Sequence, residues 1–138
     1  MDHLRWMLVL SNIRGMRDGA FVPVVQGRTI TLTEIDGEIS GLVQADVRRR
    51  TGSQEAPPIV LAAFSDPRLV SRRYENCTLA TALWDAGAAL GQTHAALSAQ
   101  GIGSCIVSSA ISGELESGLP ASLVSCVHVG SLMAGELA

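Results

Sequence analysis

The sequence contains no lysine and few aromatic residues. All ten of its basic residues are arginines, against thirteen Asp and Glu, and the formal net charge is −3. Proteins that bind nucleic acid or anionic membranes usually present a clustered basic surface, which this composition does not supply. We therefore expect neither kind of partner. Because only 4% of the residues are aromatic, the core must be built mainly from Val, Leu, Ile and Ala.

Cysteine pairs and long apolar runs are missing as well. The chain has three widely separated cysteines without a CxxC motif, and three histidines without ligand-like spacing: Cys77, Cys105 and Cys126; His3, His94 and His128. This pattern favours reduced, core-filling thiols in the cytoplasm over disulfides, and it predicts no metal site. The apolar run at 6–10 is too short for a signal peptide or a membrane span.

One stretch, residues 71–109, stands out from the rest. Leucines and alanines recur there at spacings of three, four and seven residues for some twenty positions, which predicts a long helix. Small residues such as Gly87 and Gly91 lie between the leucines, so another backbone can approach closely. We expect the helix to lie in a core or a subunit interface and to end at Gly101. Gly103–Val107 should follow as a buried strand.

The order of the remaining segments predicts the fold class. Strands joined by turns rather than by helical crossovers favour an α+β fold with a mostly antiparallel sheet, in one domain spanning 1–138. Pro23 should place its strand at the sheet edge. The expected segments are a strand at 6–11, a hairpin at 20–25 and 29–33, a helix from 33 to the arginines at 48–50, a strand at 59–64, a helical turn at 65–67, a helix at 112–118, a last strand at 122–129 and a small-residue tail at 130–138.

This ordered series resembles the C-terminal two-thirds of a nitroreductase-fold domain. The likeness runs from Leu4 to Leu132 and is closest to SagB-type dehydrogenases, which oxidise azolines to thiazoles and oxazoles in modified peptides. Arg73-Tyr74-Glu75 stands where that family has its KYGE motif, the segment 83–87 (LWDAG) where it has LLEAG, and 101–107 (GIGSCIV) where it has GLGACxI. No gap is needed to hold this register.

The resemblance implies FMN, bound at the interface of a homodimer or of a heterodimer with a full-length nitroreductase-like chain. The backbone after the glycine turn would lie along one face of the flavin ring, where its N–H groups stabilise the charge of a reduced flavin. By position this role falls to Cys105, Ile106, Val107 and Ser108. A plain buried strand is an equally good interpretation of those four residues. Arg73 and Tyr74 correspond to the catalytic pair of the azoline-oxidising members, and a peptide is the implied substrate.

The sequence also departs from the family pattern. The arginine-rich opening helix that grips the flavin phosphate has no counterpart, so we expect a partial domain without that segment. Arg73 replaces a lysine, and arginine does not serve as a proton acceptor near neutral pH. An FMN phosphate normally requires arginine forks or helix N-termini. Arg72 and Arg73 are candidates for it, although solvent-exposed surface is the better interpretation of both.

Two functional hypotheses follow. In the first, the chain is a subunit of an FMN-dependent oxidoreductase, specifically a peptide azoline dehydrogenase, and contributes half of an interface flavin site. It is then inactive alone and becomes yellow only with its partner. In the second, it is a non-catalytic, cofactor-free dimerisation or scaffold subunit derived from that family. A truncated gene product without function is the third alternative.

Overall fold

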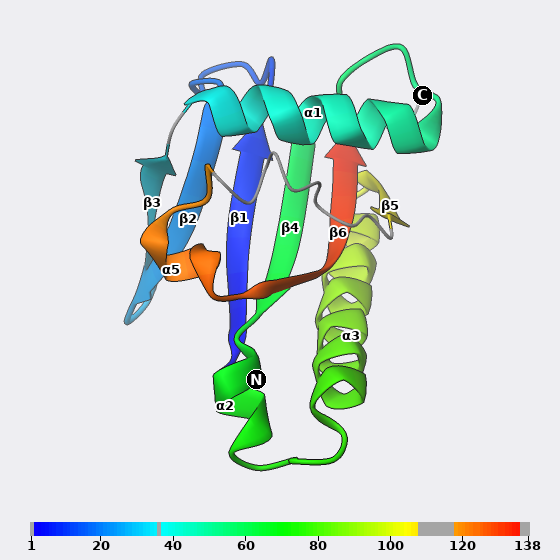
Figure 1. The fold of residues 1–138 in the computed structure, drawn as a ribbon. Coiled ribbons are helices and arrows are strands. Elements are labelled where there is room, and N and C mark those ends of the chain that lie inside the picture. Colours follow the sequence, from blue (N-terminus) through cyan, green and yellow to red (C-terminus); the bar gives the residue numbers. More distant parts are fainter. Residues whose placement is uncertain (1, 36, 108–117, 136–138) are drawn as a thin grey trace.

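A six-stranded antiparallel sheet forms the centre of the computed structural model (Figure 1), which describes residues 2–35, 37–107 and 118–135. The strand order is β3-β2-β1-β4-β6-β5, and every pairing in it is antiparallel. The predicted α+β class with a mostly antiparallel sheet is therefore confirmed. The strands are β1 (Leu4–Leu10), β2 (Gly19–Gln26), β3 (Thr29–Ile35), β4 (Ile59–Ser65), β5 (Gly103–Val107) and β6 (Val127–Gly135).

Four helices surround this sheet in the described parts of the chain. The longest, α3 (Thr78–Ala99), lies on one face of the sheet, and α1 (Gly37–Thr51) crosses the other (Figure 1). The two short helices are α2 (Pro67–Ser71) and α5 (Ala121–Val124). No described helix is long and apolar enough to cross a membrane.

The β2–β3 hairpin forms where it was predicted, but β2 is not the edge strand. It lies between β1 and β3, and β3 occupies the edge. The pairing of β2 with β1 is confined to Gly19–Phe21, whereas its pairing with β3 extends to Gln26. Pro23 falls in the part that pairs with β3 alone, so β2 is an edge locally. Proline has no N–H to donate to a neighbouring strand. Because this stretch of β2 has no partner on one side among the described residues, Pro23 is tolerated in a strand that lies inside the sheet.

The face covered by α1 holds the larger core. Alternate residues of the central strands point toward this helix, because side chains alternate between the faces of a strand. The helix contributes Ile39, Val43 and Val47, and the facing strand residues are Met7, Val9, Ala20, Val60, Ala62 and Phe64. Leu119 and Leu123 add the α5 segment to the same cluster.

Helix α3 packs closely on the opposite face. A Cβ atom at Gly130 of β6 would lie only 2.9 Å from Cδ1 of Leu90, so a side chain there would force the Leu90 side chain to shift. The helix ends as predicted at Gly101, whose φ of +74° places it in the left-handed region. The amide of Gly101 donates to the carbonyl of Ser98, and that of Ile102 donates to the carbonyl of Leu97. These are the bonds of a Schellman cap, which turns the chain directly into β5.

Several predicted boundaries need correction. The helix expected from 33 begins at Gly37, because β3 continues to Ile35. The segment expected to be a last strand from 122 contains α5 first, and β6 runs from Val127 through the region expected to be a tail. Its glycines made that region look irregular, although Gly130 and Gly135 lie in the strand. The helix predicted at 112–118 falls almost wholly outside the described residues.

Candidate functional site

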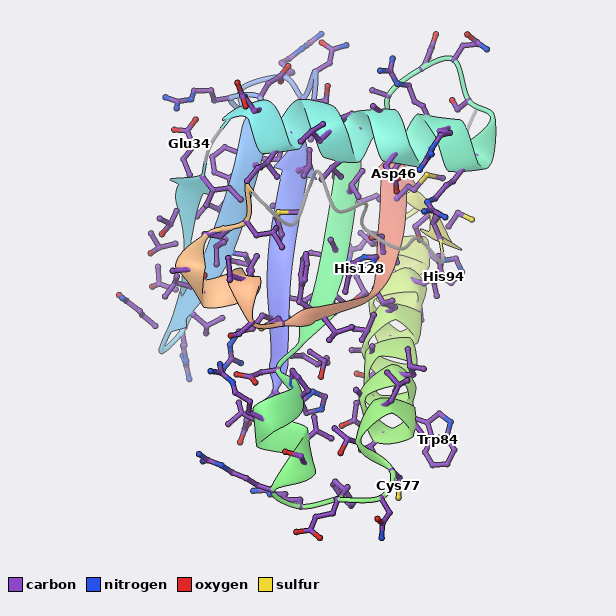
Figure 2. The ribbon with its side chains drawn as sticks, viewed as in Figure 1. Glu34, Asp46, Cys77, Trp84, His94 and His128 are labelled. Atoms are coloured by element: carbon purple, nitrogen blue, oxygen red, sulfur yellow. The ribbon has the colours of Figure 1, made fainter. Side chains whose placement is uncertain are left out.

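The outward face of α3 is apolar and almost free of large side chains. Its exposed or half-exposed residues, one helical turn apart, are Ala80, Trp84, Ala88, Gly91 and Ala95. Trp84 is 77% exposed and projects away from the sheet, as Figure 2 shows. Nothing lies within 4 Å of the positions that a Cβ would take at Gly87 or Gly91. Trp84 and the small residues around it thus leave an apolar face on α3 that no described residue covers.

Strand β5 forms the sheet edge nearest to α3. It was predicted to be buried, but Cys105 and Ile106 are exposed, because among the described residues no strand pairs beyond it. A hollow of about 290 Å³ adjoins the strand; its lining includes Gly103, Ser104, Cys105, Pro57, Pro58 and Met133. The strand therefore offers free backbone N–H and C=O groups beside a small concave surface.

A side-chain hydrogen bond fixes β5 against α3. Nδ1 of His94 lies 2.7 Å from Oγ of Ser104, ten residues further along the chain. Since α3 turns sharply at Gly101, the first residues of β5 run back beside the last turns of the helix. His94 lies near that end of α3 in Figure 2. The pair thus holds the backbone of Cys105 and Ile106 in a fixed position.

A second polar network positions α3 on the sheet. His3 is buried, and its Nε2 donates to Oδ2 of Asp85 on α3 over 2.8 Å. Nδ1 of the same ring lies 3.0 Å from Oγ of Ser65, a buried residue at the end of β4. Each ring nitrogen therefore has a partner, as a buried polar group requires. The imidazole connects β1, β4 and α3.

The predicted pair Arg73–Tyr74 lies at the other end of the helix. The carbonyl of Tyr74 accepts hydrogen bonds from the amide of Cys77 and the hydroxyl of Thr78, which starts α3. Both side chains are exposed, and neither makes a hydrogen bond or ion pair with another described residue. A helix of 22 residues is about 33 Å long, and β5 returns along only about 13 Å of it. One chain therefore does not bring Tyr74 to β5.

The remaining predicted residues can now be placed. Cys105, Ile106 and Val107 lie on β5, whereas Ser108 lies outside the described residues. Cys77 and Cys105 are exposed, so the prediction that they fill the core is wrong, and Cys126 is half-buried. Burial raises the pKa of the Cys126 thiol, which makes it less reactive. The described residues contain no group of three or more Cys, His, Asp or Glu side chains arranged to hold a metal ion.

Sequence reasoning missed the two histidine contacts that position the site. His94 and Ser104 are ten residues apart, a spacing that becomes a contact only when a helix reverses tightly into a strand. The Gly-Ile-Gly sequence at 101–103 was the local feature that could have indicated this reversal. For His3 and Asp85 no such local signal exists, since 82 residues separate them.

No protein-family model and no curated protein sequence matches the chain. Solved structures do match it. A candidate nitroreductase from Anabaena variabilis superposes with a TM-score of 0.77 at 12% identity, over 100% of this chain and 28% of the other. The E. coli microcin synthetase McbBCD complex, solved with truncated pro-MccB17 bound, contains a chain that superposes with a TM-score of 0.76 at 8% identity, over 98% of this chain and 52% of the other.

At these identities the likeness establishes the fold and no more. The chain has the nitroreductase-like fold that its sequence resembled. It spans about half of the matched microcin synthetase chain and less than a third of the Anabaena protein. The segment that aligns includes the complete sheet together with α1 and α3.

Proposed function

We propose that this nitroreductase-fold chain is a subunit of an FMN-dependent oxidoreductase acting on a peptide azoline, and that it supplies half of a flavin site completed by a second chain packed on α3. The observation that carries the proposal is the separation, along one helix, of the Arg73–Tyr74 pair from the exposed edge of β5. A second helix running antiparallel to α3 would remove that separation.

The outward face of α3 fits such a partner. In a two-fold antiparallel pair of helices, the same patch serves both subunits, and a residue further along one helix faces a residue correspondingly earlier on the other. If Trp84 of one helix packs into the open space at Gly91 of the other, Gly87 of the first helix faces Ala88 of the second. Each tryptophan fills a glycine-lined gap on the other helix, as interdigitated packing requires. The partner is a second copy or a full-length nitroreductase-like chain with a similar helix.

The same register brings the two half-sites together. The segment before the partner's α3, which carries position 74, then lies near the turn after α3 in this chain, where position 101 leads into β5. A partner tyrosine and its neighbouring arginines then approach the hollow lined by Ser104 and Cys105. The site would thus contain a backbone edge from one chain and exposed polar side chains from the other.

The residues present fit the ring of FMN better than its phosphate. The free edge of β5 at Cys105–Val107 can donate backbone N–H groups toward a flat ring, and the hollow beside it is near the lower end of the usual range of about 300–1,000 Å³ for small-molecule sites. The described residues that line that hollow include no arginine. The phosphate therefore needs basic groups from elsewhere, and Arg72 and Arg73 of a paired chain are the candidates that our register supplies.

In such a site FMN would supply the redox chemistry, by accepting electrons from the substrate. The part played by this chain is to hold and to orient. The backbone of β5, fixed by the His94–Ser104 contact, stabilises negative charge without a titrating group. Tyr74 is the proton-transferring group by position, and Arg73 stabilises an anion beside it, since a guanidinium keeps its proton.

One observation favours a second candidate, a cofactor-free scaffold subunit. Arg73 stands where the resembled enzymes have a lysine, while the apolar face around Trp84 suits assembly whether or not a flavin is bound. Catalysis would then reside wholly in the partner.

Size-exclusion chromatography with absorbance detection separates these possibilities. The chain is purified alone and co-expressed with a full-length nitroreductase-like chain, with FMN present in both cases. We expect monomer fractions to be colourless and flavin absorbance to elute only with two-chain assemblies. Flavin bound to the monomer would contradict the shared site. Assemblies that form but bind no flavin would overturn the oxidoreductase proposal and support the scaffold.

A further inference from the structure

A second cavity adjoins the hollow beside β5, and the two share Pro58 and Gly135 in their linings. It has a volume of about 1110 Å³, at the end of the sheet where the β1–β2 loop faces the turn after α3. Its apolar lining comprises Ile13, Met16, Pro58, Ile59 and Ile102, and its polar lining includes Asn12, Arg14 and Asp18. Apolar and polar residues thus share the lining, a combination that can hold the body of a small molecule and fix its orientation.

The loop that forms one wall is held in place by its own hydrogen bonds. The amide of Asn12 donates to Oδ1 of Asp18 over 2.8 Å, and the amide of Met16 donates to the carbonyl of Ile13. Asn12 has a φ of +54°, a left-handed conformation that asparagine tolerates better than most residues. The ends of the loop are thus tied together, and Arg14 lies between them on a preorganised wall.

Arg14 differs from its charged neighbours Arg17 and Asp18, which both have partners among the described residues. Arg17 forms an ion pair with Glu34, and Asp18 is engaged by the Asn12 amide. The guanidinium of Arg14 makes no hydrogen bond or ion pair with any described residue. Its five N–H donors are therefore available to a ligand.

We propose that this cavity binds a small organic anion. Its carboxylate or phosphate would pair with Arg14, and its apolar body would pack on Ile13, Ile59 and Ile102. Arginine binds a carboxylate or a phosphate through the same two parallel hydrogen bonds. The structure therefore indicates a negatively charged ligand, and the experiment below determines which of the two acids it is. This inference does not rest on the proposed flavin chemistry.

Methyl NMR of isoleucine-labelled full-length chain tests the proposal. The probes are benzoate, phenyl phosphate and neutral benzamide, titrated into the wild type, R14Q and R28Q. Arg28 lies in the β2–β3 turn outside the cavity and serves as the matched control. We expect one or both anions to shift the methyl signals of Ile13, Ile59 and Ile102 saturably, with dissociation constants on the order of 1 mM.

The R14Q variant should bind the effective anion about tenfold more weakly, R28Q should match the wild type, and benzamide should bind as weakly as the anion does to R14Q. Saturable binding of benzoate would identify a carboxylate site, and saturable binding of phenyl phosphate would identify a phosphate site. The proposal is overturned if neither anion shifts these methyls saturably, if R14Q binds as tightly as the wild type, if R28Q weakens binding equally, or if benzamide binds as tightly as the anions. Because no probe is a flavin, failure here leaves the proposed function unaffected.

Discussion

His3, one residue before β1, donates a 2.8 Å hydrogen bond to Asp85 in the N-terminal half of α3. The pair joins the helix with the exposed face to the sheet beneath it, and the other ring nitrogen meets the buried hydroxyl of Ser65. The helix that we propose as the interface is therefore held by polar contacts as well as by packing.

Replacing His3 should destabilise the chain. The H3A substitution leaves the Ser65 hydroxyl buried without its partner, which costs about 1–3 kcal/mol of the free energy of unfolding. Urea unfolding monitored by circular dichroism measures the change. The E75A variant is a suitable control, because Glu75 is exposed and makes no described side-chain contact. Equal stability of H3A and wild type would show that the network does not contribute.

Asp66 should make stability depend on acid pH. Hydrogen bonds from the Arg68 side chain lower the pKa of Asp66 from its ordinary 3.8 to about 2. A depressed pKa means that the folded state favours the ionised form, so its stabilisation is full above pH 4 and is lost as the pH falls toward 2. The free energies of unfolding of wild type and D66N should therefore converge as the pH falls from 4 to 2. A constant difference between them from pH 5 to pH 2 would be inconsistent with this assignment.

Substituting D66A should also cost about 1 kcal/mol near neutral pH. The carboxylate accepts the Arg68 amide and thereby caps α2, and alanine provides no acceptor. Asparagine retains a capping oxygen, so D66N should lose less than D66A. Thermal unfolding at pH 7 ranks the three proteins, and the opposite order of the two variants would refute the capping role.

Two glycine-to-alanine substitutions should have opposite effects. At Gly87 the new methyl enters open space and improves helix propensity, which should raise the stability of the monomer by about 1 kcal/mol. At Gly130 it would meet Leu90 at 2.9 Å, and such overpacking typically costs about 1–3 kcal/mol. Chemical denaturation measures the free energy of unfolding of G87A and of G130A against that of the wild type. A destabilised G87A monomer, or a neutral G130A, would contradict the packing described for α3.

The exposed tryptophan should govern assembly. Buried interface tryptophans often contribute about 2 kcal/mol or more, so W84E should weaken self-association about thirtyfold or more. The matched control is V25E, since Val25 is also largely exposed but lies on the β2–β3 hairpin. Sedimentation velocity gives the dissociation constants. If V25E weakened association and W84E did not, the interface would lie on the hairpin instead.

The elements with strong local signals were predictable from the sequence. The glycine at 101 marked the end of α3, and the apolar run at 59–64 marked the central strand. The position of each strand within the sheet was not predictable, because strand order depends on pairings between residues that are distant in the sequence. Pro23 suggested an edge strand, and β5 looked buried, for the same reason: the sequence does not show which strand has a neighbour.

The candidate site was predictable only in part. The likeness to a known family identified Tyr74 and the 105–107 segment, but their separation along α3 became visible only with the helix in place. The contacts of His3 and His94 connect residues that no local pattern relates. The cavity beside Arg14 brings together four segments of the chain, so its existence depends on tertiary structure.

The central claim is that one chain holds half of a flavin site. Native mass spectrometry tests it most directly, with the chain sprayed from FMN-containing buffer alone, as W84E, and co-expressed with a full-length nitroreductase-like chain. The account predicts FMN on species that contain two chains and none on the monomer or on W84E. A monomer that carries one FMN would contradict it.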